Sequence, residues 1–208
     1  MNYKIIDLDT YKRKEYFTHF TKDIPCTYSV TCKIDVTNIK NKGLKFYPAC
    51  IFAITSAVNM YEEFRMAFNS KKELIVYNNM VPCYTVFNSE TETFFNLWTE
   101  CGKDINEFIN SYNKDIKEYK NSIQMNPKEN MPENVFPISA LPLLHFEGFN
   151  LNLLKGYDYL LPIFTLGKYE NINGRLLMPM AVQVHHGVCD GYHVSRFITT
   201  LQEIIEML

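Results

Sequence analysis

Two adjacent histidines and an aspartate four residues later carry the side chains of this sequence that are best suited to chemistry. His185 and His186 precede Gly187, and Asp190 precedes Gly191. An imidazole takes up a proton near neutral pH, so one of these histidines can serve as a general base. The spacing by itself suggests that Asp190 orients the imidazole of His186. A structural histidine beside an acidic turn residue fits that spacing equally well, and a metal site fits it less well because no third ligand is evident.

The segments on either side of this motif predict how it is held. Residues 176–184 are apolar at every second position, which is typical of a strand with one buried face. Residues 194–208 are apolar at steps of three and four, which is typical of one face of a helix. The histidines therefore lie where a strand ends and a loop begins, a place that aims a side chain and leaves it accessible. Because neighbours on a strand point to opposite faces, His185 and His186 cannot do the same job, and we expect one of them to face a cleft.

Composition bounds the class of protein. We expect a single domain over residues 1–208, and a hydrophobic fraction of 47% excludes a disordered chain. The net charge of −2 with interspersed signs argues against nucleic acid or a membrane surface as partner. No apolar run approaches the roughly 20 residues that span a bilayer, and the N-terminus lacks a signal pattern. Six scattered cysteines without a Cys-x-x-Cys pair predict reduced thiols in a cytoplasmic protein with no metal.

The remaining segments predict an α/β fold of the α+β type. We expect a mixed β-sheet flanked by helices rather than a regular alternation of strand and helix. Apolar alternation and β-branched runs predict strands at residues 3–8, 27–36, 73–77, 81–87, 93–98, 138–146 and 160–168. Helical patterns cover residues 9–21, 49–60 (apolar almost all round) and 103–122 (amphipathic). A polar turn is expected at residues 38–45, and a loop with three prolines at residues 126–137.

The ten residues His185-His186-Gly187-Val188-Cys189-Asp190-Gly191-Tyr192-His193-Val194 resemble the signature of the chloramphenicol acetyltransferases. The His-x-x-x-Asp-Gly core alone is less specific, because it is similar to that of dihydrolipoyl acyltransferases and of peptide synthetase condensation domains. Further stretches resemble the same family in the same order, with a short deletion near residues 41–44. They are residues 13–15, 33–35, 45–48, 64–67, 73–76, 91–94, 138–142, 149–152 and 182–184.

This resemblance implies a chloramphenicol acetyltransferase-like, CoA-dependent acyltransferase fold. It implies transfer of the acetyl group of acetyl-CoA, a co-substrate, directly to the 3-hydroxyl of chloramphenicol within a ternary complex. It also implies a homotrimer with sites at the subunit interfaces, where one chain supplies the base and the next supplies much of the antibiotic pocket. Inactivation of the antibiotic, and hence resistance, would follow.

The resemblance also assigns roles to individual residues. His186 matches the general base, with its tautomer fixed through its own backbone carbonyl. Ser139 matches the donor of a hydrogen bond to the oxyanion, and Thr165 matches a threonine that holds a water nearby. Asp190 matches an aspartate that pairs with Arg13 and supports the site from behind, in place of the orienting role that its spacing suggests. Seen without the family, Ser139 and Thr165 would be structural residues of strands.

The implied substrate pocket has apolar walls, as expected for an aromatic ligand. Core packing is the alternative for each residue. The set is Phe20, Cys26, Tyr28, Phe94, Leu143 and Leu151, with Tyr159 near CoA. Four positions depart from some family members, which leaves affinity and substrate range open: Phe20 stands where tyrosine can occur, Leu143 where tryptophan can, Pro137 where asparagine can and Asn126 where an aromatic residue can.

Two other functions fit part of the pattern. An acyltransferase of the same fold could act on another hydroxyl or thiol acceptor. A non-catalytic protein could instead bind a hydrophobic ligand in the same pocket. The presence of both His186 and Ser139 argues against the binder, because binding requires neither.

Overall fold

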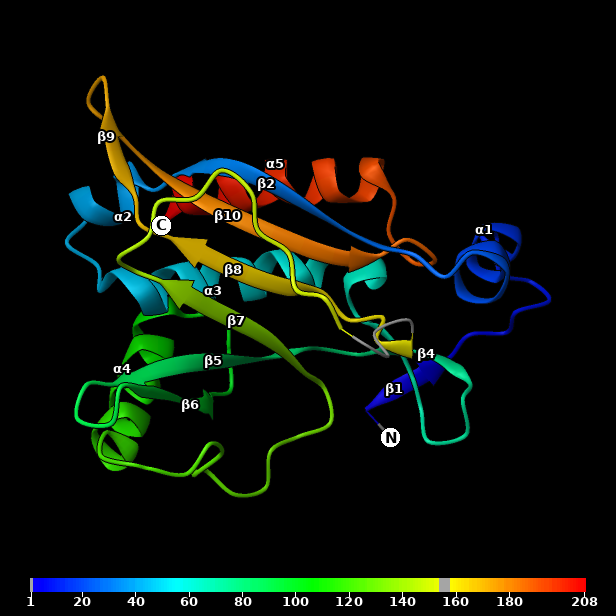
Figure 1. The fold of residues 1–208 in the computed structure, drawn as a ribbon, viewed down its shortest axis with the longest axis horizontal. Helices are drawn as coiled ribbons and strands as arrows, with labels where there is room; N and C mark the ends of the chain where they lie inside the picture. Colours follow the sequence, from blue (N-terminus) through cyan, green and yellow to red (C-terminus); the bar gives the residue numbers. More distant parts are fainter. Residues whose placement is uncertain (1, 154–157) are drawn as a thin grey trace.

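A mixed sheet forms the centre of the molecule. The computed structural model describes residues 2–153 and 158–208, and these form a seven-stranded sheet. Its central pairs β8–β7 and β7–β5 are parallel, whereas β2–β10, β10–β8 and β5–β6 are antiparallel, and β9 adds to β10 (Figure 1). In spatial order the strands are β2 (Thr27–Asp35), β10 (Arg175–His185), β8 (Ile163–Gly167), β7 (Val135–Leu141), β5 (Val81–Asn88) and β6 (Thr93–Trp98), with β9 (Glu170–Ile172) at the side.

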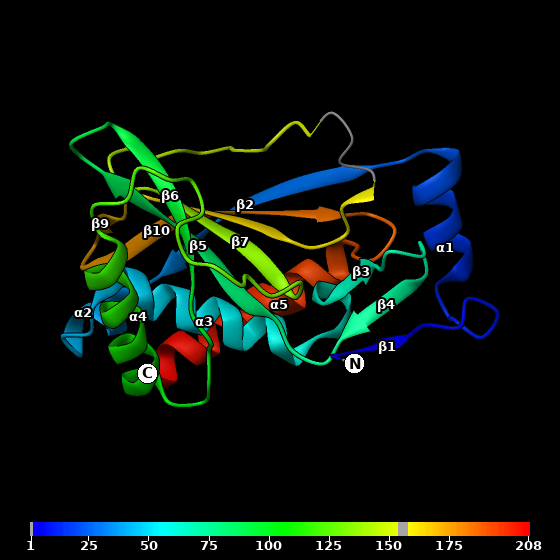
Figure 2. The ribbon, with the colours of Figure 1, turned by 90° about the horizontal axis from the view of Figure 1, so that it is seen from below.

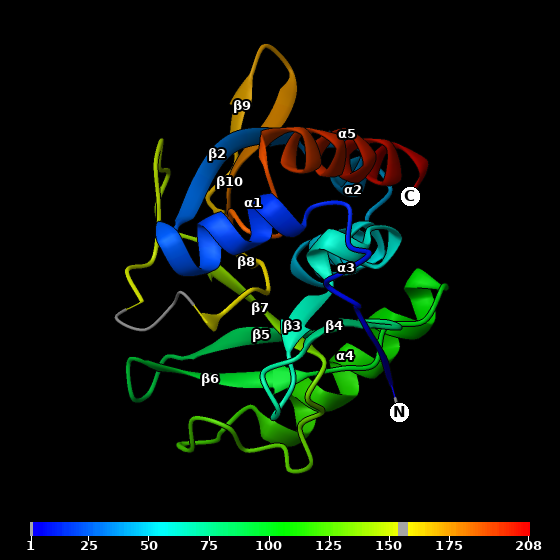
Figure 3. The ribbon, with the colours of Figure 1, turned by 90° about the vertical axis from the view of Figure 1, so that its right-hand side faces the viewer.

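Helices cover one face of this sheet. Helices α3 (Phe46–Met60) and α5 (Gly191–Met207) pack side by side there, and α4 (Ile105–Tyr119) packs against α3 (Figure 3). Helix α3 is buried almost all round, as its apolar sequence predicts, because it lies between the sheet and the other two helices. Helix α4 buries only Phe108, Tyr112 and Asp115, and the carboxylate of Asp104 caps its first turn.

A smaller antiparallel sheet lies at the end of the molecule near helix α1. It comprises β1 (Tyr3–Ile5), β4 (Leu74–Tyr77) and β3 (Met66–Phe68), in that order (Figure 2). Helix α1 (Lys14–Thr18) continues into a π-helical turn, η1 (His19–Asp23), which leads directly into β2. Figure 1 shows α1 and the beginning of α5 at this same end, beyond the point where β10 finishes.

The predicted mixed sheet with flanking helices is confirmed, and several boundaries differ. Residues 37–41 form a short helix, α2 (Thr37–Asn41), where a polar turn was expected, and the chain leaves it through Gly43 at φ 66°. Strand β7 begins at Val135 and ends at Leu141, so Pro137 lies in a strand and residues 142–146 do not. Strands β3 and β9 were not predicted, since three residues are too few to show a period.

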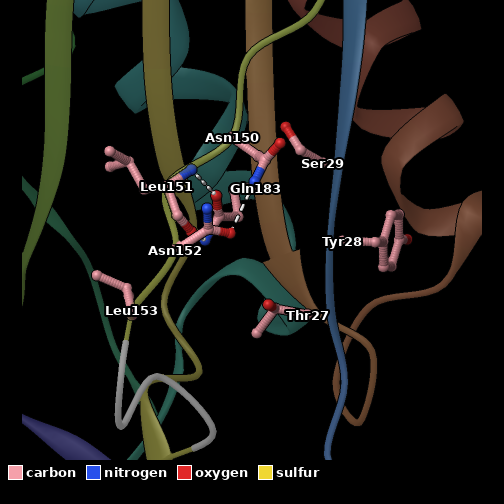
Figure 4. A pocket seen from close by; sticks show the side chains of 8 residues that line it. All are labelled: Thr27, Tyr28, Ser29, Asn150, Leu151, Asn152, Leu153 and Gln183. Atoms are coloured by element: carbon pink, nitrogen blue, oxygen red, sulfur yellow. Dashed lines mark hydrogen bonds between the residues drawn. The ribbon is translucent and has the colours of Figure 1, made fainter.

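The second face of the sheet is partly open. Side chains of Ser139, Thr165 and Gln183 point to this face. The segment 149–153 crosses part of it: Ser29 donates to the Phe149 carbonyl at 2.6 Å, and the Gln183 amide bonds the Leu151 backbone at 2.7 Å and 3.0 Å (Figure 4). Among the described helices, none combines the length and apolar character needed to cross a membrane.

Candidate active site

The turn that follows β10 is closed around His185. The backbone N–H groups of Val188 and Cys189 donate to the His185 carbonyl at 3.1 Å and 3.0 Å. The N–H of Gly187 donates to Nδ1 of His185 at 3.0 Å. A Cβ at Gly187 would lie 3.1 Å from that nitrogen, so this position has no room for a side chain without displacing the ring. His185, buried with 1% exposure, therefore shapes the turn, and His186 is presented at its beginning.

The imidazole of His186 is held between aromatic rings. The Phe20 ring stacks on it with centroids 3.9 Å apart and planes 4° apart, and the Tyr28 ring lies 5.1 Å away. The backbone N–H of His186 donates to the backbone carbonyl of Cys26 at 2.9 Å. Phe20 reaches this position from the π-helical turn η1, in which the Ile24 N–H bonds the His19 carbonyl. The stacked Phe20 ring thus orients the imidazole, and the hydrogen bond to Cys26 holds the backbone that carries it.

No hydrogen bond among the described residues fixes the tautomer of His186. Its Nδ1 is buried and receives no hydrogen bond from the described residues, so the expected bond to its own carbonyl is not seen. The ring orientation is instead set by Phe20 and Tyr28. With Nδ1 buried, Nε2 is the nitrogen that can meet a substrate.

Asp190 connects two helices. Its Oδ2 accepts from Arg13 at 2.6 Å, and its Oδ1 accepts from the Tyr192 N–H at 3.1 Å and the His193 N–H at 3.4 Å, which caps α5. Burial would raise the pKa of Asp190, but the hydrogen bond from Arg13, the neighbouring His193 side chain, the Arg13 charge and the His193 backbone N–H hold that pKa below its ordinary value. Within the described residues the carboxylate makes no bond to the His186 ring, so it joins α1 to α5.

Ser139 and Thr165 lie side by side, away from His186. They are register partners on the parallel strands β7 and β8, so their side chains share the open face. Across β10 the partner of Thr165 is Ala181, which precedes His186 by five residues. At roughly 3.3 Å per residue, that offset separates the two positions by about 16 Å along the strand. One chain alone does not bring the predicted oxyanion donor to the predicted base.

Comparisons with known proteins place the chain. A family model described as "Chloramphenicol acetyltransferase" matches residues 1–202. The chain belongs to the chloramphenicol acetyltransferase family. A curated chloramphenicol acetyltransferase of Clostridium perfringens is 50% identical over 205 residues, covering 99% of both chains. One of Vibrio anguillarum is 50% identical over 208 residues, covering 100% of this chain and 96% of the relative. The resemblance seen in the sequence and the prediction of an enzyme are confirmed.

Solved structures agree on the fold. A chloramphenicol acetyltransferase superposes with a TM-score of 0.85 at 24% identity, covering 98% of this chain and 99% of that one. The cubic core of the pyruvate dehydrogenase multienzyme complex superposes with a TM-score of 0.66 at 14% identity, covering 91% of this chain and 85% of that one. At such identities the likeness concerns the fold alone.

The predicted pocket residues of this chloramphenicol acetyltransferase family member fall into two groups. Phe20, Cys26 and Tyr28 gather around His186. Phe94 lies on β6, four strands from β10 and 52% exposed, and Leu143 is 90% exposed. The structure does not bring these two to the base.

Leu151 and Tyr159, the other two predicted substrate-binding residues, belong to neither of these groups. Leu151 borders a pocket of about 390 Å³ over the open face, together with Ser29 and Gln183, and the Tyr28 ring points away from these side chains (Figure 4). Tyr159 packs against the core, and burial raises the pKa of its hydroxyl. The residues between Leu153 and Asp158 lie outside the described part of the chain.

Sequence reasoning missed three ionisable neighbours of the turn that presents His186: Glu63, His193 and Arg196. His193 did carry a signal, because it stands three residues after an aspartate that begins a helix, the spacing of a capping box. Glu63 carried none, since it comes from the short helix η2 (Glu62–Phe64), distant in sequence. Residues 2–153 and 158–208 contain no group of three or more His, Cys, Asp or Glu arranged to hold a metal ion.

Proposed function

We propose that this enzyme transfers the acetyl group of acetyl-CoA to the 3-hydroxyl of chloramphenicol and thereby inactivates the antibiotic. The observation that carries this proposal is 50% identity, over essentially the whole chain, with curated proteins named for that reaction. The geometry around His186 fits it, because a rigid turn and a stacked ring hold an imidazole whose inner nitrogen is buried. The outer nitrogen is left for a substrate hydroxyl.

The proposed mechanism needs one base and one hydrogen-bond donor. Nε2 of His186 takes the proton of the 3-hydroxyl as its oxygen attacks the thioester carbonyl of acetyl-CoA. The negative charge that develops on the carbonyl oxygen accepts a hydrogen bond from Ser139, with a water held by Thr165 beside it. The intermediate collapses to the acetyl ester as the CoA thiolate leaves. The thiolate then takes from the imidazolium the proton that came from the 3-hydroxyl. No acyl-enzyme forms.

The mechanism requires a second copy of the chain. Because Ser139 and His186 are separated along the sheet of one chain, Ser139 from a neighbouring subunit must reach the base. We therefore propose the homotrimer that the family resemblance implies, with sites between subunits. The exposed apolar residues Phe94 and Leu143 support this arrangement, because they would complete the antibiotic pocket at such an interface. The free thiols of all six cysteines are compatible with the cytoplasmic location proposed with it.

The test is thiol release from acetyl-CoA with chloramphenicol as acceptor, run beside a 3-deoxy analogue and the His186→Ala variant. We expect release that needs both the 3-hydroxyl and His186. Dihydrolipoamide in place of chloramphenicol tests the rival acceptor. Release with the 3-deoxy analogue would contradict the assigned hydroxyl. Absence of release from folded oligomer would contradict the substrate and direct attention to Phe20, Leu143, Pro137 and Asn126.

A further inference from the structure

Five charged or ionisable side chains form a continuous network behind the catalytic turn. We call Arg13, Asp190, His193, Glu63 and Arg196 the rear network. Beyond the Arg13–Asp190 pair, His193 lies with Nδ1 2.8 Å from Asp190 Oδ1 and with Nε2 3.4 Å from Glu63 Oε1. Arg196 then donates to both oxygens of Glu63, at 3.1 Å and 3.2 Å. These side chains are 10–35% exposed, so solvent screens their interactions less than those of a surface ion pair.

Nδ1 of His193 lies within reach of two hydrogen-bond partners, and bonding to one excludes bonding to the other. The backbone N–H of Asp190 donates to Nδ1 at 3.1 Å, which completes a capping box and requires Nδ1 without a proton. Asp190 Oδ1 also lies 2.8 Å from Nδ1, and a bond there requires Nδ1 with a proton. Nε2 faces Glu63 in both cases. Glu63 therefore favours the neutral Nε2–H tautomer that keeps the capping box intact.

We propose that His193 and Glu63 are positioning residues for the reaction, acting through Asp190 on the turn that carries His186. This inference rests on the proposed function. With neutral His193, Asp190 keeps Oδ2 for Arg13 and its backbone N–H for His193, and the turn is held from both sides. A protonated His193 bonds Asp190 Oδ1 in place of the capping bond and competes there with the backbone N–H groups of Tyr192 and His193. The imidazole of His186, four residues before Asp190, then loses its fixed position.

Charged and ionisable groups face His193 from several elements. Asp190 and Glu63 supply negative charge, Arg13 and Arg196 supply positive charge, and the Tyr192 ring lies 5.8 Å away. Burial raises the pKa of the Cys189 thiol and of the Tyr11 hydroxyl, so both stay neutral near pH 7. Histidine is the side-chain type that changes charge between pH 5 and 8.

Three variants separate positioning from simple structural support. His193→Gln retains the capping box, because glutamine is the usual partner at that position, but it cannot take a proton. Glu63→Gln keeps the size of the side chain and removes its charge. Glu62→Gln is the matched control, since Glu62 is exposed and adjacent. We expect Glu63→Gln to lower kcat about tenfold with KM within about twofold, and His193→Gln to keep kcat near the wild-type value. In the double variant the loss caused by Glu63→Gln should disappear, because Glu63 acts only through His193.

The pH profile gives the decisive readout. In this proposal protonation of either His186 or His193 impairs the reaction, so log kcat/KM of the wild type should fall toward acid pH with a slope steeper than one. In His193→Gln the slope returns to one. The proposal is overturned by equal slopes in the two proteins, by multiplicative effects in the double variant, or by a Glu62→Gln loss as large as that of Glu63→Gln.

A measurement without turnover separates this inference from the proposed function. Imidazole ¹⁵N spectra of the oligomer should show His193 as the Nε2–H tautomer at pH 8, with the tautomer ratio shifting in Glu63→Gln and unchanged in Glu62→Gln. An Nδ1–H tautomer, or no response to Glu63→Gln, would overturn the inference even in an active enzyme. A wild type that shows these spectra and releases no thiol with chloramphenicol would refute the proposed substrate and leave the network standing.

Discussion

The region around His186 and the region around Ser139 are built in opposite ways. The proposed base, His186, is surrounded by partners within its own chain: Phe20 stacks on its ring, His185 closes its turn and Asp190 links its loop to Arg13. Ser139 lies half-buried on a partly open sheet face. Leu143, four residues later in the sequence, is 90% exposed. The contacts that hold His186 therefore all come from one chain, whereas the proposed acceptor side around Ser139 lacks covering walls within that chain.

This difference predicts which half of the proposed site depends on the proposed subunit assembly. Tight local bonds keep His186 in place without a neighbour, so its geometry should already exist in an isolated chain. An apolar acceptor pocket needs walls, and exposed residues such as Phe94 become walls only when another surface covers them. We expect variants on the two sides to behave differently, in catalysis and in their response to subunit mixing.

The largest effect is expected from His186→Ala. Removing a general base typically costs roughly 10²–10⁴ in rate, and the neighbouring His185 imidazole is engaged with the turn, where its Nδ1 accepts from the Gly187 N–H. Steady-state thiol release measures the loss, and the thermal unfolding midpoint checks that the turn still folds. His145→Ala is the control, because His145 bonds the Lys168 carbonyl away from the turn and should keep full activity. An active His186→Ala enzyme would refute the assigned base.

Ser139→Ala should cost roughly 10²–10³ in kcat, the usual effect of losing an oxyanion donor. Mixing the Ser139→Ala protein with the His186→Ala protein also tests whether the two residues meet between subunits. If the two residues meet only between subunits, equal amounts unfolded and reassembled together should recover about a quarter of wild-type activity, since each functional half is present with probability one half. Two inactive proteins that stay inactive when mixed would place both residues in the same chain's site.

Sequence patterns predicted the half of the site that is local. The strand and helix periods that meet at Gly191 predicted the turn, and the apolar run at residues 49–60 predicted the buried helix α3. Arg13 and Asp190 are 177 residues apart, and no period connects such positions, so only the family resemblance implied their pairing. Glu63 and the π-helical turn that carries Phe20 are set by tertiary packing and left no mark in the sequence.

Asp190→Asn should lower activity by roughly tenfold, because loosening the turn misplaces the base. It should also lower the free energy of unfolding by about 1–2 kcal/mol, from a weakened cap and a partly exposed ion pair. The pKa of Asp190 is lower in the folded protein than in the unfolded chain, so this stabilisation is present above about pH 4 and is lost as pH falls through the folded value.

Chemical denaturation between pH 7 and pH 2 measures that dependence. The variant should show a shallower loss of stability at acid pH than the wild type. Asp9→Asn is the control, because Asp9 pairs with Lys14 at a side chain that is 87% exposed, and its removal should change little. Parallel stability curves for wild type and Asp190→Asn would contradict a structural role for the Arg13–Asp190 pair.

The smallest effect, and the most discriminating for the acceptor side, is expected from Leu143→Ala. In one chain this side chain is 90% exposed, so its removal should leave the unfolding midpoint unchanged. If a neighbouring subunit covers it and it contacts the antibiotic, the KM for chloramphenicol should rise several-fold while kcat stays the same, since lost apolar contact weakens ground state and transition state equally. Met207→Ala, which truncates another exposed apolar side chain at the far end of α5, should change neither quantity. A KM as insensitive to Leu143→Ala as to Met207→Ala would place Leu143 outside the pocket, and the exposed surface near Ser139 would then need another explanation.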